Sequence, residues 1–225
     1  MAKTPFTNAS AAYLDGPRRQ VPGFGDLHRM VSMLLQERVP ERARILVLGA
    51  GGGLELKALA DTHPDWRFVG VDPSAAMLDL AKDTAKDHLD RIAFVQGTVE
   101  AAPSDLFDGA LCLLTFHFIV EKDRATTLAA LRQRLVPGAP LVLAHLSFPQ
   151  REPERSRWIA RHVLWGAAAD AGAAQFAVAE EAIRTRLTIL DPAEEERMLR
   201  DAGFAEVELF YAGLSLRGWS AIAGH

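Results

Sequence analysis

The sequence predicts an α/β protein built on one doubly wound, mostly parallel sheet of seven strands. Three observations support this fold class. Short apolar segments alternate with helical segments of about 10–15 residues, which is typical of parallel strands joined by crossover helices. A purely helical stretch then interrupts the alternation after the fifth strand. Finally, two strands follow each other across a turn that is too short for a parallel connection.

The parallel part of the sheet comes first along the chain. The segment 44–48 (RILVL) is apolar throughout, as expected of a strand that is buried on both faces. Helices are predicted from apolar residues at helical spacing. The predicted strands are 44–48, 67–71, 92–95, 110–114 and 141–146, and the predicted helices are 24–38, 54–63, 75–87 and 122–135.

The alternation ends at Pro149. Two helices, 154–169 and 174–186, are predicted next as an insertion, and Asp191 then caps a helix over 192–201. The strands 205–211 and 215–222 form a hairpin, so the last strand is the antiparallel member of the sheet.

Composition places the chain among ordinary globular proteins, with 49% hydrophobic and 24% charged residues. The net charge of −4 argues against broad electrostatic capture of nucleic acid. A single cysteine, Cys112, excludes an intrachain disulfide and fits a reducing compartment. The first residues lack the apolar core of a signal peptide, and the longest apolar runs are too short to cross a bilayer. We therefore expect a cytoplasmic protein without a membrane span.

A glycine-rich turn, Gly49–Gly53 (GAGGG), lies between the first buried strand and a helix. Glycine permits a sharp turn and the close approach of a ligand, which favours a nucleotide-like ligand over a plain strand–helix connection. Dinucleotide-binding folds place a third glycine where this chain has Leu54. The bulky leucine disfavours a pyrophosphate, whereas a sulfonium cofactor without phosphates does not need that glycine.

An acidic residue, Asp72, closes the second strand at the spacing of a ribose-binding acid. Its carboxylate could accept hydrogen bonds from two ribose hydroxyls, a feature that both cofactor classes share. The alternative is an acid that only stabilises the start of the following helix.

Five motifs in order then resemble class I S-adenosylmethionine-dependent methyltransferases: ILVLGAGGG, FVGVDPSAAMLDLAK, IAFVQGTVEAAP, FDGALCLLTFHFI and LRQRLVPGAPLVLAHLS. The ending AGFAEVELFYAGLSLRGWSAIA is similar to the terminal helix and hairpin of that family. The resemblance implies a Rossmann-like fold, methyltransferase activity and S-adenosylmethionine (SAM) as cofactor.

A finer resemblance concerns VPGF at 21–24 and the two-helix insertion. Both are similar to the bacterial tRNA wobble-uridine carboxymethyltransferases, and this resemblance implies a carboxylated variant of the cofactor and a tRNA partner.

Carried over residue by residue, the class I motifs imply cofactor contacts that run from the amino-acid end to the adenine. The contacts are Gly49, Ala50, Gly51 and Gly53 at the amino-acid end, Leu114 and Thr115 near the sulfonium, Asp72 at the ribose, and Pro73, Met77, Thr98 and Val99 at the adenine. Two positions depart from the family, because Val47 and Thr98 stand where many relatives carry acids. Hydrogen bonds to charged groups contribute about 1.5–3 kcal/mol against about 1 kcal/mol for neutral ones, so we expect weaker cofactor binding.

No catalytic residue is identified by pattern. His117 follows the fourth strand and is a candidate base or substrate contact, and Arg184 in the insertion is a candidate partner for a carboxylate. No histidine–cysteine cluster has zinc spacing, so we expect no metal.

We expect a single domain over residues 1–225. An N-terminal arm and helix (1–40) precede the cofactor-binding core (41–148), a helical lid (149–190), and the terminal helix and hairpin (191–225). We expect the N-terminal arm and the lid to cover the crevice at the carboxyl ends of the strands. The predicted function is transfer of a methyl group from SAM to a nitrogen or oxygen acceptor in a small molecule or tRNA. The alternatives are a non-catalytic SAM-binding or scaffold protein and, less favoured, a nicotinamide oxidoreductase; a homodimer is left open.

Overall fold

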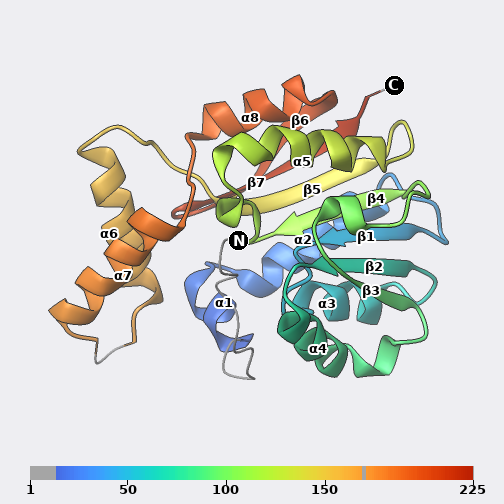
Figure 1. Cartoon of the computed structure of the whole chain (residues 1–225), viewed down its shortest axis with the longest axis horizontal. Coiled ribbons are helices and arrows are strands. Elements are labelled where there is room, and N and C mark those ends of the chain that lie inside the picture. Colours follow the sequence, from blue (N-terminus) through green and yellow to red (C-terminus); the bar gives the residue numbers. More distant parts are fainter. Residues whose placement is uncertain (1–13, 169–170, 225) are drawn as a thin grey trace.

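The computed structural model describes residues 14–168 and 171–224, which form one seven-stranded sheet flanked by helices (Figure 1). The strand order is β3-β2-β1-β4-β5-β7-β6. The predicted fold class is confirmed. The strands are β1 (Arg44–Leu48), β2 (Arg67–Asp72), β3 (Ile92–Gln96), β4 (Gly109–Leu113), β5 (Pro140–Leu146), β6 (Phe204–Gly213) and β7 (Leu216–Ala223).

The direction of the strands changes only toward the β6 edge of the sheet. The first five strands pair in parallel, and β7 pairs antiparallel with both β5 and β6. The chain therefore passes from β5 to the outer strand β6 and returns to insert β7 between them. The last strand is the antiparallel member, as the short hairpin turn predicted.

Helices cover both faces of the sheet. The helices are α1 (Asp15–Gln20), α2 (Phe24–Gln36), α3 (Leu54–Thr62), α4 (Ala75–Thr84), α5 (Glu121–Gln133), α6 (Glu154–Gly166), α7 (Ala173–Arg186) and α8 (Pro192–Asp201), with short 3-10 helices η2 (Lys86–His88), η3 (Val99–Ala101) and η4 (Phe116–Phe118). Successive residues of β1 point to opposite faces: Val47 packs in the core with α2 and α3, and Leu46 in the core with α5 and α8. This alternation makes the fold doubly wound.

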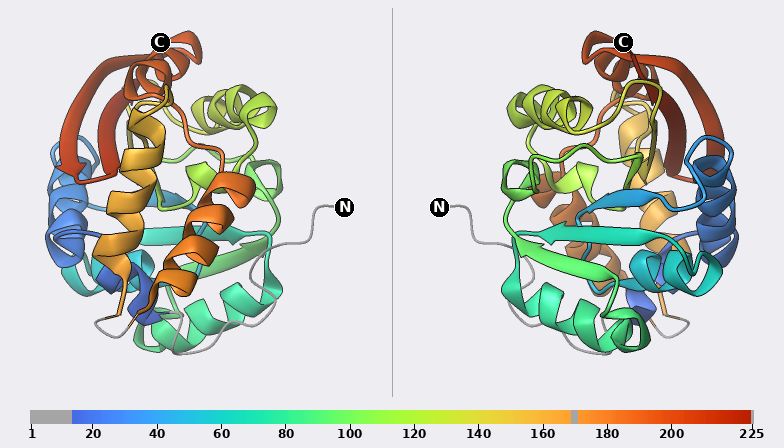
Figure 2. Two further views of the ribbon diagram at one scale, coloured as in Figure 1. Left: turned by 90° about the vertical axis from the view of Figure 1, so that its left-hand side faces the viewer. Right: turned by 90° about the vertical axis from the view of Figure 1, so that its right-hand side faces the viewer.

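The helices of the insertion lie apart from the two layers. Figures 1 and 2 show α6 and α7 side by side beyond the edge at which the parallel strands end, with α1 next to them. No helix within residues 14–168 and 171–224 is long and apolar enough to cross a membrane.

Some predicted boundaries were wrong by a few residues. The helix expected over 24–38 ends at Gln36, and the one expected over 75–87 ends at Thr84 and gives way to η2. The fourth strand stops before Leu114, because a φ of 53° at this residue leaves the extended region. The helix expected over 154–169 ends at Gly166, because the next residue, Ala167, is extended. The first 13 residues, which include the start of the predicted arm and most of the residues cited against a signal peptide, lie outside the described residues.

A buried ion pair joins the two helices on one face of the sheet. The guanidinium of Arg124 in α5 donates to the Glu195 carboxylate in α8, and His145 Nε2 in β5 lies 3.0 Å from Glu195 Oε1. Burial alone would raise the pKa of Glu195, but His145 and Arg124 outweigh it and lower that pKa. Arg124 also donates to the backbone oxygens of Thr188 and Ile119, so it fixes the chain after α7 and the chain after η4.

We predict that Arg124→Met lowers the free energy of unfolding by about 3–5 kcal/mol, because the buried Glu195 carboxylate loses the guanidinium group that pairs with it. A urea titration followed by circular dichroism measures the change. The control is Arg200→Met, which breaks an exposed pair with Glu196 on α8 and should change stability by less than about 0.5 kcal/mol. Equal losses in the two variants would contradict a structural role for the buried pair.

Candidate functional site

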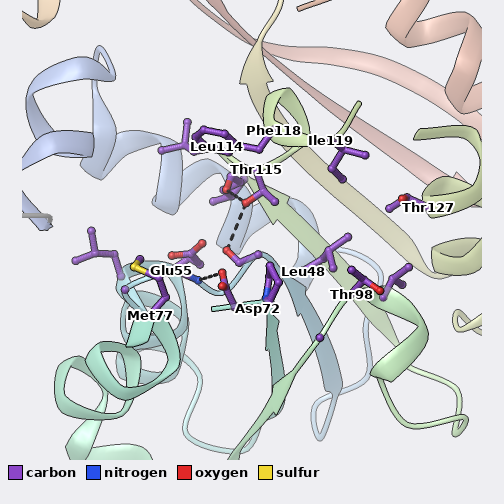
Figure 3. A pocket seen from close by; sticks show the side chains of 18 of the residues that line it. Leu48, Glu55, Asp72, Met77, Thr98, Leu114, Thr115, Phe118, Ile119 and Thr127 are labelled. Atoms are coloured by element: carbon purple, nitrogen blue, oxygen red, sulfur yellow. Dashed lines mark hydrogen bonds between the residues drawn. The ribbon is translucent and has the colours of Figure 1, made fainter. Parts of the chain in front are cut away.

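A cavity of about 640 Å³ opens where the parallel strands end (Figure 3). Ligands of open α/β sheets bind at this edge, outside the carboxyl ends of the strands. Its wall is made of residues from the turns after β1 to β4 and from the N-terminal helices: Pro17, Phe24, His28, Leu48, Gly49, Gly51, Gly52, Leu54, Glu55, Asp72, Pro73, Met77, Gly97, Thr98, Val99, Glu100, Leu113, Leu114, Thr115, Phe118, Ile119, Val120, Asp123, Thr126 and Thr127.

The glycine turn starts with a close approach between two strand ends. Gly49 has a φ of 74°, and a Cβ added there would lie 2.1 Å from Thr115 Oγ1. Thr115 Oγ1 in turn donates to the Leu113 carbonyl at 2.9 Å. Glycine at position 49 thus allows the chain after β4 to lie directly against the end of β1, which brings two predicted cofactor contacts together.

Two residues of the turn lie away from the cavity wall. Gly53 has a φ of 78°, and a Cβ there would lie 2.8 Å from the Ala81 Cα, so this glycine allows α3 to pack against α4. Ala50 is fully buried beneath the turn. Neither residue lines the cavity, so the cofactor contacts predicted for Ala50 and Gly53 have no support from the cavity wall.

The carboxylate of Asp72 is fixed at both oxygens. Oδ2 accepts a hydrogen bond from the Gly51 amide at 3.0 Å, and Oδ1 accepts one from the Ser74 amide at 2.9 Å. Burial raises the pKa of Asp72, although these two hydrogen bonds lower it. Each carboxylate oxygen can accept more than one hydrogen bond, so the residue is suited to bind a pair of hydroxyls.

The remaining predicted contacts line the same cavity from three turns. Pro73 and Met77 come from the start of α4, Thr98 and Val99 from the turn after β3, and Leu114 and Thr115 from the turn after β4. Leu114 adopts a φ of 53°, a strained backbone that is rare for a bulky residue and tends to occur at functional sites.

Thr98 does not act alone at its end of the cavity. Its hydroxyl donates to the Glu100 carboxylate, and this hydrogen bond is the main cause that lowers the pKa of Glu100. Since its hydrogen is used in this way, the Thr98 oxygen is oriented as an acceptor. Glu100 lines the cavity as well, so the acid that the sequence lacks at position 98 is present two residues later.

Sequence reasoning missed three groups in the cavity wall. Pro17, Phe24 and His28 come from α1 and α2, while Asp123 and its neighbours come from the start of α5. The N-terminal arm was expected at this edge of the sheet, but no local pattern placed the starts of α2 and α5 there. Glu55 is different, because it follows the glycine turn by two residues, and an acid so close to a ligand-binding turn was a signal that could have found it.

The cavity is acidic. It is lined by the carboxyl groups of Glu55, Asp72, Glu100 and Asp123, and no lysine or arginine contributes to its wall within the described part of the chain. His28 adds no positive charge near neutral pH, because burial, helped by Arg18, lowers its pKa to about 4. Such a wall favours a ligand that carries positive charge.

Neither catalytic candidate lines the cavity. His117 is buried, its Nδ1 accepts from the Leu146 amide at 3.4 Å, and burial together with His145 holds its pKa well below the ordinary value. Arg184 donates to Ser156 Oγ at 3.1 Å within the insertion. Both arrangements favour structural roles.

The insertion as a whole contributes no described residue to the cavity wall, which is closed from that side by α1 and α2 instead. A covering role for the insertion stays a prediction. Among residues 14–168 and 171–224, no group of three or more metal-binding side chains could hold a metal ion.

Comparisons with known proteins agree with this geometry. A family described as "Methyltransferase domain" matches residues 45–138. The chain is 25% identical over 204 residues to the carboxy-S-adenosyl-L-methionine synthase of Campylobacter hominis, which covers 91% of this chain and 87% of the relative. The enzyme of the same name from Chromohalobacter salexigens is 29% identical over 216 residues, with 91% and 77% covered.

Solved structures show the same fold. Human N-acetylserotonin methyltransferase in complex with SAM superposes with a TM-score of 0.60 at 16% identity over 88% of this chain. The chain spans only about half, 52%, of that enzyme's length.

The motif order, the matched domain and the seven-stranded sheet with its antiparallel β7 agree with one another and support a class I SAM-dependent methyltransferase. It is an enzyme whose cofactor is SAM, and its relatives extend to enzymes named for the carboxylated form of that cofactor.

We predict that Gly49→Ala destabilises the protein by about 2–5 kcal/mol, because the new Cβ adds a clash with Thr115 to the strain of a positive φ. Gly138→Ala is the matched control, since Gly138 has a φ of 84° but nothing within 4 Å of an added Cβ. This control should lose only about 1–2 kcal/mol. Urea denaturation measures both variants, and equal losses would show that the strand ends are not held in close contact.

Proposed function

We propose that the cavity binds SAM with its ribose on Asp72, its adenine between Met77 and the Thr98–Val99 turn, and its amino-acid end at the glycine turn. The observation that supports this placement is the Asp72 carboxylate, which is fixed by the Gly51 and Ser74 amides and lies in the cavity wall. Val99 adds an apolar side chain to the wall at the adenine end. Figure 3 shows Ile119 and Thr127 on the same side of the cavity as Thr98.

In this proposal, the acceptor lies against the part of the wall that α1 and α2 form. The cofactor supplies an electrophilic methyl group, so the protein mainly has to hold the acceptor in line with it and exclude water. Phe24 and His28 pack edge to face with ring centroids 4.4 Å apart and form an aromatic wall there. A neutral His28 can accept a hydrogen bond from an acceptor N–H or O–H group.

The charges of the wall favour a small-molecule acceptor over tRNA. Binding of a polyanion relies on lysine and arginine side chains, and the described cavity wall contributes carboxylates instead. We therefore propose methyl transfer to a nitrogen or oxygen of a small neutral or cationic molecule. A cytoplasmic location and a homodimer remain proposals from the sequence.

A second candidate is use or formation of carboxylated SAM. It is favoured by relatives named carboxy-S-adenosyl-L-methionine synthase that cover about nine tenths of the chain. An added carboxylate calls for a cationic partner, and the acidic wall disfavours it. Mass spectrometry of the nucleoside that copurifies with the protein decides between the two: ordinary SAM or its demethylated product supports the first candidate, and a carboxylated sulfonium supports the second.

We predict that Asp72→Ala weakens SAM binding at least tenfold, because two ribose hydroxyls lose a buried acceptor and the glycine turn loses its anchor. Isothermal titration calorimetry gives the dissociation constant. Asp79→Ala, which removes an exposed acid on α4 paired with Lys82, is the control and should leave the affinity unchanged. Unchanged affinity in Asp72→Ala would mean that the cofactor lies elsewhere.

A further inference from the structure

Glu55 occupies a position in the cavity that the sequence motifs did not assign. It is the second residue of α3 and follows the glycine turn directly. Figure 3 shows its carboxyl group next to Asp72, beneath Leu114 and Thr115, pointing into the cavity at the end that holds the glycine turn.

The strand before the turn brings no charge to this end of the cavity. Val47 on β1 is fully buried in the core with α2 and α3. Leu48 and the glycines that line the cavity have no charged side chains. Glu55, two residues after the glycine turn, is therefore the acidic side chain that the β1–α3 segment contributes to the cavity.

We propose that Glu55 forms an ion pair with the α-ammonium group of bound SAM and releases its own proton to solvent when the cofactor binds. The inference rests on the proposed placement of the amino-acid end of SAM at the glycine turn. The ammonium group is a compact cation with three N–H donors, and a carboxylate is its natural partner. The side-chain O–H bond of the acid breaks, the proton leaves, and the resulting carboxylate accepts hydrogen bonds from the ammonium.

The ionisation of Glu55 supports this coupling. Burial raises the pKa of Glu55 to about 8, and the neighbouring Asp72 on β2 adds to the shift, while the backbone amide of Glu55 opposes it. The other titratable groups toward this side are Cys112 on β4, whose pKa burial also raises, and His28 on α2, which is neutral near pH 7. No cation is among the causes that set the pKa of Glu55, so a bound ammonium group would be the first positive charge to stabilise its carboxylate.

The linkage has a defined sign. An acid with a pKa of about 8 is about nine-tenths protonated at pH 7, so binding at that pH releases close to one proton per site. Between pH 6 and pH 7, affinity should increase about tenfold, because the ionised fraction of Glu55 increases about tenfold. Above about pH 8 the gain ends, since an α-amino group has an ordinary pKa of about 7.7–8.0 and loses its own charge.

The test compares three ligands by isothermal titration calorimetry at pH 6, 7 and 8, in buffers of different ionisation enthalpy. SAM carries both the ammonium and the sulfonium, S-adenosylhomocysteine keeps only the ammonium, and 5′-methylthioadenosine has neither. For Glu55→Gln we expect a loss of at least tenfold for the first two ligands, no loss for the third, and no proton release. Glu100→Gln is the matched acid-to-amide control in the same cavity. Any change in affinity that it causes should be the same for all three ligands, and proton release on SAM binding should persist.

Each other outcome overturns the inference in a recognisable way. A loss for SAM alone would place Glu55 at the sulfonium, and equal losses for all three ligands would make it a general support of the cavity. If the unchanged protein binds none of the ligands, the proposed function fails with it; if that protein binds them and Glu55→Gln does too, only the role of Glu55 fails. Glu55→Gln should fold, because an amide resembles the protonated acid. Without ligand, this variant should melt at a higher temperature than the unchanged protein at pH 9, where the buried acid is ionised. At pH 4, where the acid is neutral, the two melting temperatures should be the same.

Discussion

The site depends on one carboxylate that joins three elements. Asp72 ends β2, accepts the amide of Gly51 from the turn after β1, and accepts the amide of Ser74 at the start of α4. These contacts pair two backbone amides with one side chain, and they set the distance between neighbouring turns of the sheet. The same side chain thus shapes the cavity and presents two oxygen atoms to it.

Much of this architecture could be predicted from the sequence because it is local. Apolar strands, the glycine turn and the acid at the end of β2 follow from neighbouring residues, and the antiparallel position of β7 follows from a short turn. The end of β4 could not be predicted, because a positive φ at Leu114 is imposed by tertiary contacts. His28 was missed for the same reason, since its place in the wall depends on how α2 packs against the sheet.

The acidity of the cavity connects the ligand to the protein's own ionisation. Burial disfavours the ionised form of a carboxyl group, and it raises the pKa values of Glu55 and Asp72. A positively charged ligand offsets the cost of holding a buried carboxylate in its ionised form. A neutral analogue of the same shape gains no such benefit, so the wall distinguishes ligands by charge as well as by shape.

The insertion of β7 between β5 and β6 affects how the protein can form during synthesis. β5 gains its second neighbour, and β6 its only pairing partner among the described strands, from β7 (Leu216–Ala223), which is synthesised after both of them. Until then the β5 edge has unpaired backbone groups of the kind that other chains can pair with. During synthesis, the nascent chain therefore carries an open sheet edge at β5 until β7 has been made.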